Sequence, residues 1–438
     1  MLTTAIGATD WRNEAAAVWP GLKTHIIGDE PKAARVGESE AAFDERANGE
    51  WRAMLGGERG PSLLISSYES MSRLIDVVQK HELVFDTLIG DEIHQCKKGG
   101  VGRSQNMRVL LGRTNHASLL TGTAIHNRPT DLYNLLDMCA PGRYGHSFWA
   151  WAQKYFMTRV AKGGFGRTVD ELVDKARLAR DLEEVLLSRS STEAFGHLPP
   201  VIVKLKQIEV AGAARMSPAK LLKVKEGSHL DLMLRECVGA KLKAAVQFIA
   251  EELDGPVVTY TWRPRDAIKL AEMLAKVKVS CTLATGEDAP LRRSRKIDEW
   301  KAGATRVLSC TMDAVKESAT LTRASEMVFI DFDWLGGKVL QNMGRTHPSR
   351  QPENERRPSN YYFFCVKNGP DEVVAEALLD KFRQAEGLTA KDADAETLSK
   401  SLEPLERKLA QESAPVVLSD LVSRMEHRAK RMADLGFL

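Results

Sequence analysis

The sequence predicts an α/β protein built of two tandem units, each a parallel sheet covered by helices. Short apolar runs alternate with helix-like segments in residues 63–122, and the same alternation returns in residues 255–366. This order is expected of parallel strands joined by helical crossovers. Between the two, HLPPVIVK at 197–204 carries consecutive prolines, which end a helix and set an extended segment. At 438 residues the chain can bury at least two cores.

The first unit is predicted from three apolar runs and the segments between them. Helices are expected at 70–81 and 104–114, and the strands are expected at 63–68, 83–90 and 117–122. Residues 132–187 are expected to be mostly helical, with the glycine-rich interruption KGGFGR. The aromatic cluster Phe148–Phe156 has helical spacing, so we interpret it as core rather than as a surface that stacks on bases.

The second unit follows the same logic. Helical patterns such as PRDAIKLAEMLAKV separate its apolar runs, and the chain from Pro370 onward is predicted to be helical and highly charged. Its strands are expected at 255–262, 277–286, 305–311, 325–334 and 360–366.

Composition narrows the class of protein. The net charge is only +3, from 62 basic and 59 acidic residues, so any DNA-binding surface must be local. The sequence has no run of about 18 apolar residues and its start lacks a signal-peptide pattern, so we expect a cytoplasmic or nucleoid-associated protein without a membrane partner. The six cysteines are scattered without a C-x-x-C pair, which argues against disulfides and a zinc site.

An acidic pair follows the second of these strands. In IGDEIHQCKK, Asp91 and Glu92 come directly after the apolar run, where an α/β sheet places its ligand-binding residues. In a nucleotide hydrolase the first such carboxylate holds magnesium and the second orients the attacking water. His94 lies close enough in sequence to relay the state of the nucleotide. The alternative is a solvated turn after a strand.

A second motif, LLTGTAIHNRPTDLYNLLDM at 119–138, places the small residues Thr121, Gly122 and Thr123 after the next strand. Such a turn lets the backbone approach a neighbouring loop, and Asn127 and Asp131 can cap the helix that follows. The alternative is an ordinary strand-to-helix turn.

The ordered set of motifs resembles the Swi/Snf-type family of superfamily 2 helicase-like ATPases. The set continues with EVLLSRSSTEAFGHLPP, DFDW and QNMGRTHPSRQ, and the resemblance covers about residues 11–381. It implies two RecA-like lobes, ATP and Mg²⁺ as cofactors, double-stranded DNA as partner, and DNA-dependent ATP hydrolysis with translocation. The chain has the compact form of a family member without large accessory domains, which by resemblance favours a bacterial or phage source.

The resemblance also implies roles for single residues. Asp91 matches the magnesium ligand, Glu92 the water-activating carboxylate and His94 the coupling histidine, while Gln341 and Arg345 match the motif that reaches the phosphates from the second lobe. The implied cofactor contacts are Thr121, Gly122, Thr123 and Asp331. Arg189 and the second-lobe loop are implied DNA contacts, and a local basic cluster adds others; the DNA-binding candidates are Lys97, Lys98, Arg103, Arg189, Ser318, Thr320 and Thr322. For the basic cluster, solvated helix faces balanced by acids are the alternative.

Two departures from the family pattern concern ATP turnover. Pro348 stands where the family has a second arginine, with Arg350 two positions later, and Lys316 and Ser318 replace the glycines usual before Leu321. The phosphate-binding string G-x-x-x-x-G-K-[ST] occurs nowhere, and LTTAIGATDWRNE at the start resembles the family's next segment, a strand leading to a W-x-x-E helix. We therefore expect lobe one to lack its first strand and phosphate loop. A late start, a truncation, or an upstream polypeptide that supplies the loop would each explain this.

The resulting domain prediction is an incomplete first lobe with helical extension at 1–200, a linker at 201–240, a second lobe at 241–370 and a charged helical tail at 371–438.

The sequence leaves two functions open. One is a DNA-dependent ATPase and translocase that needs a supplied phosphate loop, and the other is a degenerate helicase-like protein that binds DNA or a partner without hydrolysis. A metal-dependent nuclease built on Asp91, Glu92 and His94 is a third class, disfavoured because no further acidic cluster accompanies them.

Overall fold

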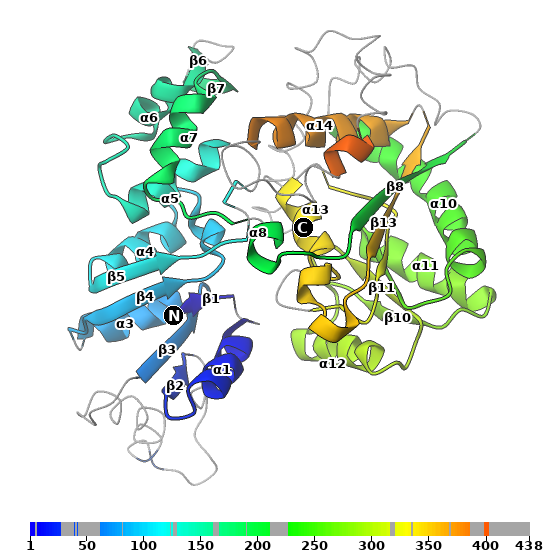
Figure 1. Cartoon of the computed structure of the whole chain (residues 1–438), viewed down its shortest axis with the longest axis horizontal. Helices are drawn as coiled ribbons and strands as arrows, with labels where there is room; N and C mark the ends of the chain where they lie inside the picture. The colour runs from blue at the N-terminus through cyan, green and yellow to red at the C-terminus, as the bar shows by residue number, and fades with distance from the viewer. Residues whose placement is uncertain are drawn as a thin grey trace. The chain divides into compact units, whose positions relative to one another are not determined.

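A computed structural model of the chain forms two compact units, residues 1–125 with 129–185 and residues 126–128 with 186–438 (Figure 1). The structure describes residues 1–4, 7–27, 39, 42, 62–80, 82–122, 124–125, 129–160, 166–189, 191–210, 227–315, 320–333, 336–367, 369–385 and 398–402.

A five-stranded sheet forms the centre of the described part of the first unit, in the order β2-β3-β1-β4-β5. Every pair in it is parallel, which confirms the predicted class. Its strands are β1 Leu2–Thr3, β2 Lys23–Ile26, β3 Ser62–Ser67, β4 Phe85–Gly90 and β5 Thr114–Leu119. Leu2 pairs with Ser66 of β3 and with Gly90 of β4, so β1 lies in the middle of the sheet.

Helices α1 Gly7–Val18, α3 Met71–Lys80 and α4 Gly102–Leu111 pack on this sheet. α3 buries Met71, Leu74, Ile75 and Val78, the i, i+3, i+4, i+7 spacing that predicts an amphipathic helix. These side chains join the core that also takes in Leu2 and the residues after β4. The predicted helices at 70–81 and 104–114 are thus confirmed with shifted ends.

The extension of the first unit contains η2 Pro129–Asp131, α5 Leu132–Cys139, α6 Phe148–Tyr155 and α7 Lys175–Glu183. It also contains an antiparallel hairpin, β6 Phe156–Val160 with β7 Arg167–Leu172. The prediction of mostly helical structure is wrong for this hairpin, because β-branched residues flank a glycine-rich segment there, a composition typical of paired strands.

The aromatic residues of this extension pack on one another. Trp151, Tyr155 and Phe156 are buried, and the Trp151 ring lies 5.3–5.6 Å from the rings of Tyr133, Tyr155 and Phe156. Phe148 is half-buried and contacts the same cluster, its ring 6.0 Å from that of Trp151. The interpretation of this cluster as core is confirmed for the three buried rings.

The second unit is built on a six-stranded parallel sheet in the order β10-β11-β9-β12-β13-β8 within the described residues (Figure 1). Its strands are β8 Val201–Ile208, β9 Val257–Thr261, β10 Cys281–Ala284, β11 Val307–Thr311, β12 Glu326–Phe329 and β13 Ser359–Val366. Its helices are α8 Ser191–Phe195, α10 Gly227–Glu251, α11 Pro264–Lys276, α12 Pro290–Lys301, α13 Gly336–Met343 and α14 Pro370–Ala385, with the 3₁₀ turns η3 Pro348–Arg350 and η4 Glu353–Glu355.

The predicted boundaries between the parts shift accordingly. The first unit ends at Val185 rather than at residue 200. The range 201–240, predicted as a linker, holds strand β8, which pairs along its whole length with β13, and the start of α10. The predicted tail begins in α14, and Leu398 and Leu402 are buried in the core of the second unit. Residues 403–438 lie outside the described part.

A buried ion triad ties three elements of the second unit together. Lys241 of α10 is fully buried, and its ammonium group lies 2.7 Å from Asp331 Oδ1 and 2.8 Å from Asp371 Oδ1. The second oxygens of the two carboxylates accept from backbone N–H groups, Trp262 N for Asp331 and Val366 N for Asp371. Each charge is therefore paired and hydrogen-bonded, as buried charges generally are.

In the described part of the chain, the helices are too short or too polar to cross a bilayer.

Candidate functional site

The carboxylate of Asp91 stands at the carboxyl end of β4 and is held by two donors. Its Oδ2 atom accepts from the Trp11 indole at 2.9 Å and from the Thr3 hydroxyl at 3.1 Å. Both donors come from the first 11 residues, through β1 and α1. Sequence reasoning missed Thr3 and Trp11 as site residues, although the W-x-x-E helix that carries Trp11 was recognised.

The backbone of Asp91 is fixed as well. Its N–H donates to Leu2 O at 2.8 Å, and its carbonyl accepts from the Tyr68 hydroxyl at 2.6 Å. Burial, followed by Cys96 and the charges of Asp91 and Glu92, raises the pKa of Tyr68, so this hydroxyl keeps its proton and remains a donor.

Gly90 allows the close packing just before the acidic pair. A Cβ atom at this position would lie 3.3 Å from side-chain atoms of Leu119 and Met107 and 3.4 Å from Ile93. Strand β5 and the 3₁₀ helix η1 Ile93–Cys96 therefore approach β4 at a distance that a larger side chain would prevent.

Glu92 has a left-handed backbone, with φ 51° and ψ 44°. A residue with a side chain rarely adopts this region, which costs about 1–3 kcal/mol and occurs preferentially at functional positions. The conformation turns the chain from β4 into η1 directly at the acidic pair. The surrounding contacts therefore hold this turn in one conformation, unlike a loosely solvated turn.

His94 joins the acidic pair to the T-G-T segment. Its Nδ1 atom lies 3.1 Å from Glu92 Oε2 and 3.2 Å from Thr121 Oγ1, and Ile93 N donates to Leu120 O at 2.9 Å. The structure therefore brings Glu92, His94 and Thr121 together, as expected for strand ends in a parallel sheet. Gly122 is exposed beside them, and Thr123 lies outside the described residues.

The chemistry of Asp91 fits a hydrated magnesium ion carried by a nucleotide. Mg²⁺ prefers oxygen ligands and is commonly held through one or two carboxylates plus phosphates and water. Donors such as Thr3 and Trp11 orient a carboxylate for this task. Among the described residues, no group of three or more His, Cys, Asp and Glu side chains could hold a metal ion.

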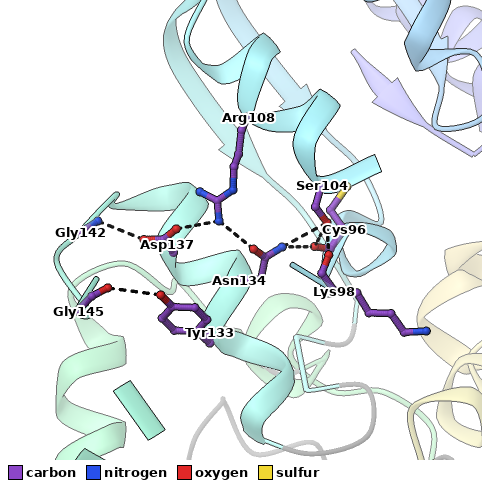
Figure 2. A network of polar contacts seen from close by, with 9 residues as sticks. All are labelled: Cys96, Lys98, Ser104, Arg108, Tyr133, Asn134, Asp137, Gly142 and Gly145. Carbon is purple, nitrogen blue, oxygen red and sulfur yellow. Dashed lines mark hydrogen bonds and ion pairs between the residues drawn. The ribbon is translucent and has the colours of Figure 1, made fainter. Parts of the chain in front are cut away.

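Most of the basic cluster after the acidic pair is paired with acids. Lys97 lies 3.7 Å from Asp131, Arg103 lies 2.8 Å from Glu69, and Arg108 lies 2.7 Å from Asp137. Figure 2 shows Arg108 pointing to Asp137 and Asn134, while the Lys98 side chain extends away from this network. Lys98 is exposed, so it is the cluster's best-placed side chain for a phosphate.

One contact in the second unit links two predicted segments of the site. Leu321 N donates to Arg345 O at 2.9 Å, which joins the Thr320–Thr322 segment to the end of α13. Arg357 supports the same segment, since its guanidinium donates to Thr322 O at 3.0 Å. Arg345 itself is buried, and Gln341 is half-buried on α13.

The other candidates of the second unit are dispersed. Asp331, predicted as a cofactor contact, uses its carboxylate in the buried triad with Lys241. Arg189 is exposed, and Ser318 lies outside the described residues. Pro348 begins η3, and Arg350 ends that turn at an exposed position. Sequence reasoning missed Lys241 and Asp371, which follow no motif.

The helix-borne basic run at 292–296 is also partly neutralised. Lys296 lies 2.6 Å and Arg292 3.7 Å from Asp288, and Arg293 donates to Thr285 O. Burial raises the pKa of Asp288, whereas Lys296 and Arg292 lower it. The net effect is a pKa below the ordinary value of an aspartate. Much of this run therefore anchors the start of α12.

Comparison with known families decides what this arrangement belongs to. Residues 4–223 match the SNF2-related domain, and residues 240–349 match the helicase conserved C-terminal domain. The chain belongs to the SNF2 family. The first match covers the first unit and runs on through β8, and the second match covers most of the second unit, so the two α/β units are the RecA-like lobes of an SNF2-type helicase-like protein of superfamily 2.

Several SNF2 relatives show the extent of the likeness. The mouse "DNA annealing helicase and endonuclease ZRANB3" is 23% identical over 330 residues, which cover 70% of this chain and 30% of that protein. The Xenopus tropicalis "SWI/SNF-related matrix-associated actin-dependent regulator of chromatin subfamily A-like protein 1" is 22% identical over 317 residues, which cover 68% and 33%. The Saccharomyces cerevisiae "DNA repair and recombination protein RDH54" is 28% identical over 150 residues, which cover 33% and 16%.

This chain spans about a third of the length of the first two relatives. These relatives are eukaryotic, so they give no support to the predicted bacterial or phage source.

Proposed function

We propose that this protein is a DNA-dependent ATPase of the SNF2 type that translocates on double-stranded DNA when a phosphate-binding loop is supplied. The observation that carries the proposal is the Asp91, Glu92, His94 and Thr121 cluster at the ends of β4 and β5. A carboxylate oriented by two donors and a second carboxylate in a constrained turn are what magnesium binding and water activation require.

In this proposal the chain's own residues divide the work. Asp91 would hold the magnesium ion that accompanies ATP, Glu92 orients and deprotonates the attacking water, and His94 passes the state of Glu92 to Thr121. Gln341 and Arg345 act from the second lobe. Mg²⁺ supplies charge neutralisation on the phosphates when ATP is bound.

The second candidate function is binding of DNA or of a partner without hydrolysis. It is favoured by Pro348, which replaces the family's second arginine, while Arg350 is exposed at the end of η3. The first candidate, and the second where it binds DNA, require a surface for duplex DNA, which is consistent with relatives named as DNA annealing and DNA repair proteins.

The DNA surface is tested by two matched charge removals. Lys98→Gln is expected to weaken binding of a 20-base-pair duplex and to reduce the salt dependence by about 0.9 in log Kd per log salt, the value for one phosphate contact. Arg108→Gln removes the same charge but is expected to leave this slope unchanged, because Arg108 is engaged by Asp137 and Asn134. Fluorescence anisotropy at 50–200 mM salt measures both. Equal slopes for Lys98→Gln and the wild type would remove Lys98 from the DNA surface.

A further inference from the structure

Asn134 is buried on α5, within the segment 119–138 but outside the site residues predicted there, and it contacts the segment that follows the acidic pair. Its Nδ2 group donates to Cys96 O, the last residue of η1, and to Ser104 Oγ at 3.3 Å. Its Oδ1 atom accepts from Arg108 Nη2 at 2.8 Å. Figure 2 shows the amide between Arg108 and the Cys96 carbonyl.

The orientation of this amide is fixed by its partners. Arg108 has only donors, so it must face the amide oxygen, which turns the amide NH₂ group toward Cys96. Arg108 is itself held by Asp137, three residues after Asn134 on α5. A flipped amide would place a donor against the guanidinium and an acceptor against the Cys96 carbonyl.

Ser104 completes the contact from α4. Its hydroxyl donates to Cys96 O at 2.9 Å and also approaches Lys98 O. Ser104 is 1% and Asn134 5% exposed, so water does not compete for these bonds. Two buried side chains from two helices therefore hold the backbone directly after the D-E-x-H box.

The other end of η1 is held by the segment that leads into α5. Ile93 N donates to Leu120 O, and His94 Nδ1 meets Thr121 Oγ1. Lys97 adds an ion pair with Asp131, the residue before α5. The segment 91–98 is thus fastened at both ends to residues 120–134.

We propose that Asn134 is a positioning residue for the acidic pair. By holding the Cys96 carbonyl it fixes η1 and, through η1, the directions of Glu92 and His94, so that η1 and α5 move together when Thr121 moves. This inference rests on the proposed function for its kinetic consequence but not for its structural one.

Two variants separate the contacts of Asn134. Asn134→Asp keeps the size and the acceptor for Arg108 and replaces the Nδ2 donor, which bonds to Cys96 O and Ser104 Oγ, by an acceptor. Arg108→Gln loses the guanidinium and keeps the donor to Cys96. Hydrogen exchange is followed at Gln95 N and Lys97 N, which bond to Glu92 O and His94 O within the segment.

In Asn134→Asp the exchange of Gln95 and Lys97 is expected to rise about tenfold, the effect of one lost buried hydrogen bond, and in Arg108→Gln by less than about threefold. Amides of β3 and β4 should keep their wild-type rates in both. The positioning role is overturned if Asn134→Asp leaves Gln95 and Lys97 unchanged, or if exchange rises equally across the first unit.

The kinetic arm separates this proposal from the proposed function. Where the wild type hydrolyses ATP, Asn134→Asp is expected to lower kcat at an unchanged KM, the pattern of a lost transition-state arrangement, whereas an equal loss in Arg108→Gln would contradict the assignment. A wild type that hydrolyses no ATP even with the phosphate-loop segment supplied overturns the proposed function alone, and the exchange rates still decide the role of Asn134.

Discussion

Replacing Lys241 by methionine is expected to lower the free energy of unfolding of the second unit by about 3–5 kcal/mol, the cost of removing one partner from a buried ion pair. The substitution keeps most of the side-chain volume but leaves Asp331 and Asp371 buried without their counter-charge. Because Asp331 lies just beyond β12 and Asp371 at the start of α14, both elements should loosen.

Chemical denaturation followed by circular dichroism measures this loss. Lys301→Met is the matched control, since Lys301 pairs with Asp298 at 3.7 Å on an exposed face and should contribute at most about 1 kcal/mol. A Lys241→Met protein as stable as the control would mean that the triad is not a stabilising feature of the second unit.

The triad also gives a pH dependence. Burial lowers the pKa of Lys241, but the charges of Asp331 and Asp371 outweigh burial and raise it above its ordinary value of 10.5. The folded state therefore holds this proton more tightly than the unfolded state, so the contribution to stability is complete below pH 10.5 and is lost as pH rises through the folded value. The stability difference between wild type and Lys241→Met should shrink above pH 10.5.

Trp151→Ala is expected to destabilise the first unit by about 3–5 kcal/mol, the range for truncating a fully buried large aromatic side chain. Trp151 is 0% exposed and packs between Tyr133, Phe148, Tyr155 and Phe156. Thermal unfolding of the full chain, with the loss assigned to the first unit by hydrogen exchange, measures the effect.

Trp151→Phe separates the core role from base stacking. The indole N–H has no hydrogen-bond partner among the described residues, so its removal offsets part of the lost volume and the cost should stay below about 1.5 kcal/mol. DNA affinity should be unchanged in this variant. A Trp151→Ala protein of wild-type stability with weaker binding to single-stranded DNA would favour the stacking interpretation.

The sequence was sufficient for features that depend on local pattern. The apolar run LVFDTLIG predicts strand β4, and the strand-end rule alone places Glu92, His94 and Thr121 near one another. The hairpin of β6 and β7 was not predicted, because its strands are short and mostly exposed and therefore carry no apolar run.

Contacts between distant residues could not be read from the sequence. Thr3 and Trp11 reach Asp91 across 88 and 80 residues, and Lys241 reaches Asp331 across 90. No local pattern encodes such distances. The same holds for the basic cluster, where Lys98 and Arg108 are equivalent in sequence and differ only because folding brings Asp137 to Arg108.

The most direct test of the proposed function is ATP hydrolysis measured with and without duplex DNA. The phosphate-loop segment of an SNF2 relative is provided in trans or joined ahead of Met1. The chain alone and the Glu92→Gln variant serve as controls. The account predicts turnover that duplex DNA stimulates and that Glu92→Gln lowers by at least about 100-fold, the effect of losing a general base. A complemented protein that folds and binds duplex DNA but hydrolyses no ATP would contradict the account and leave the binding function.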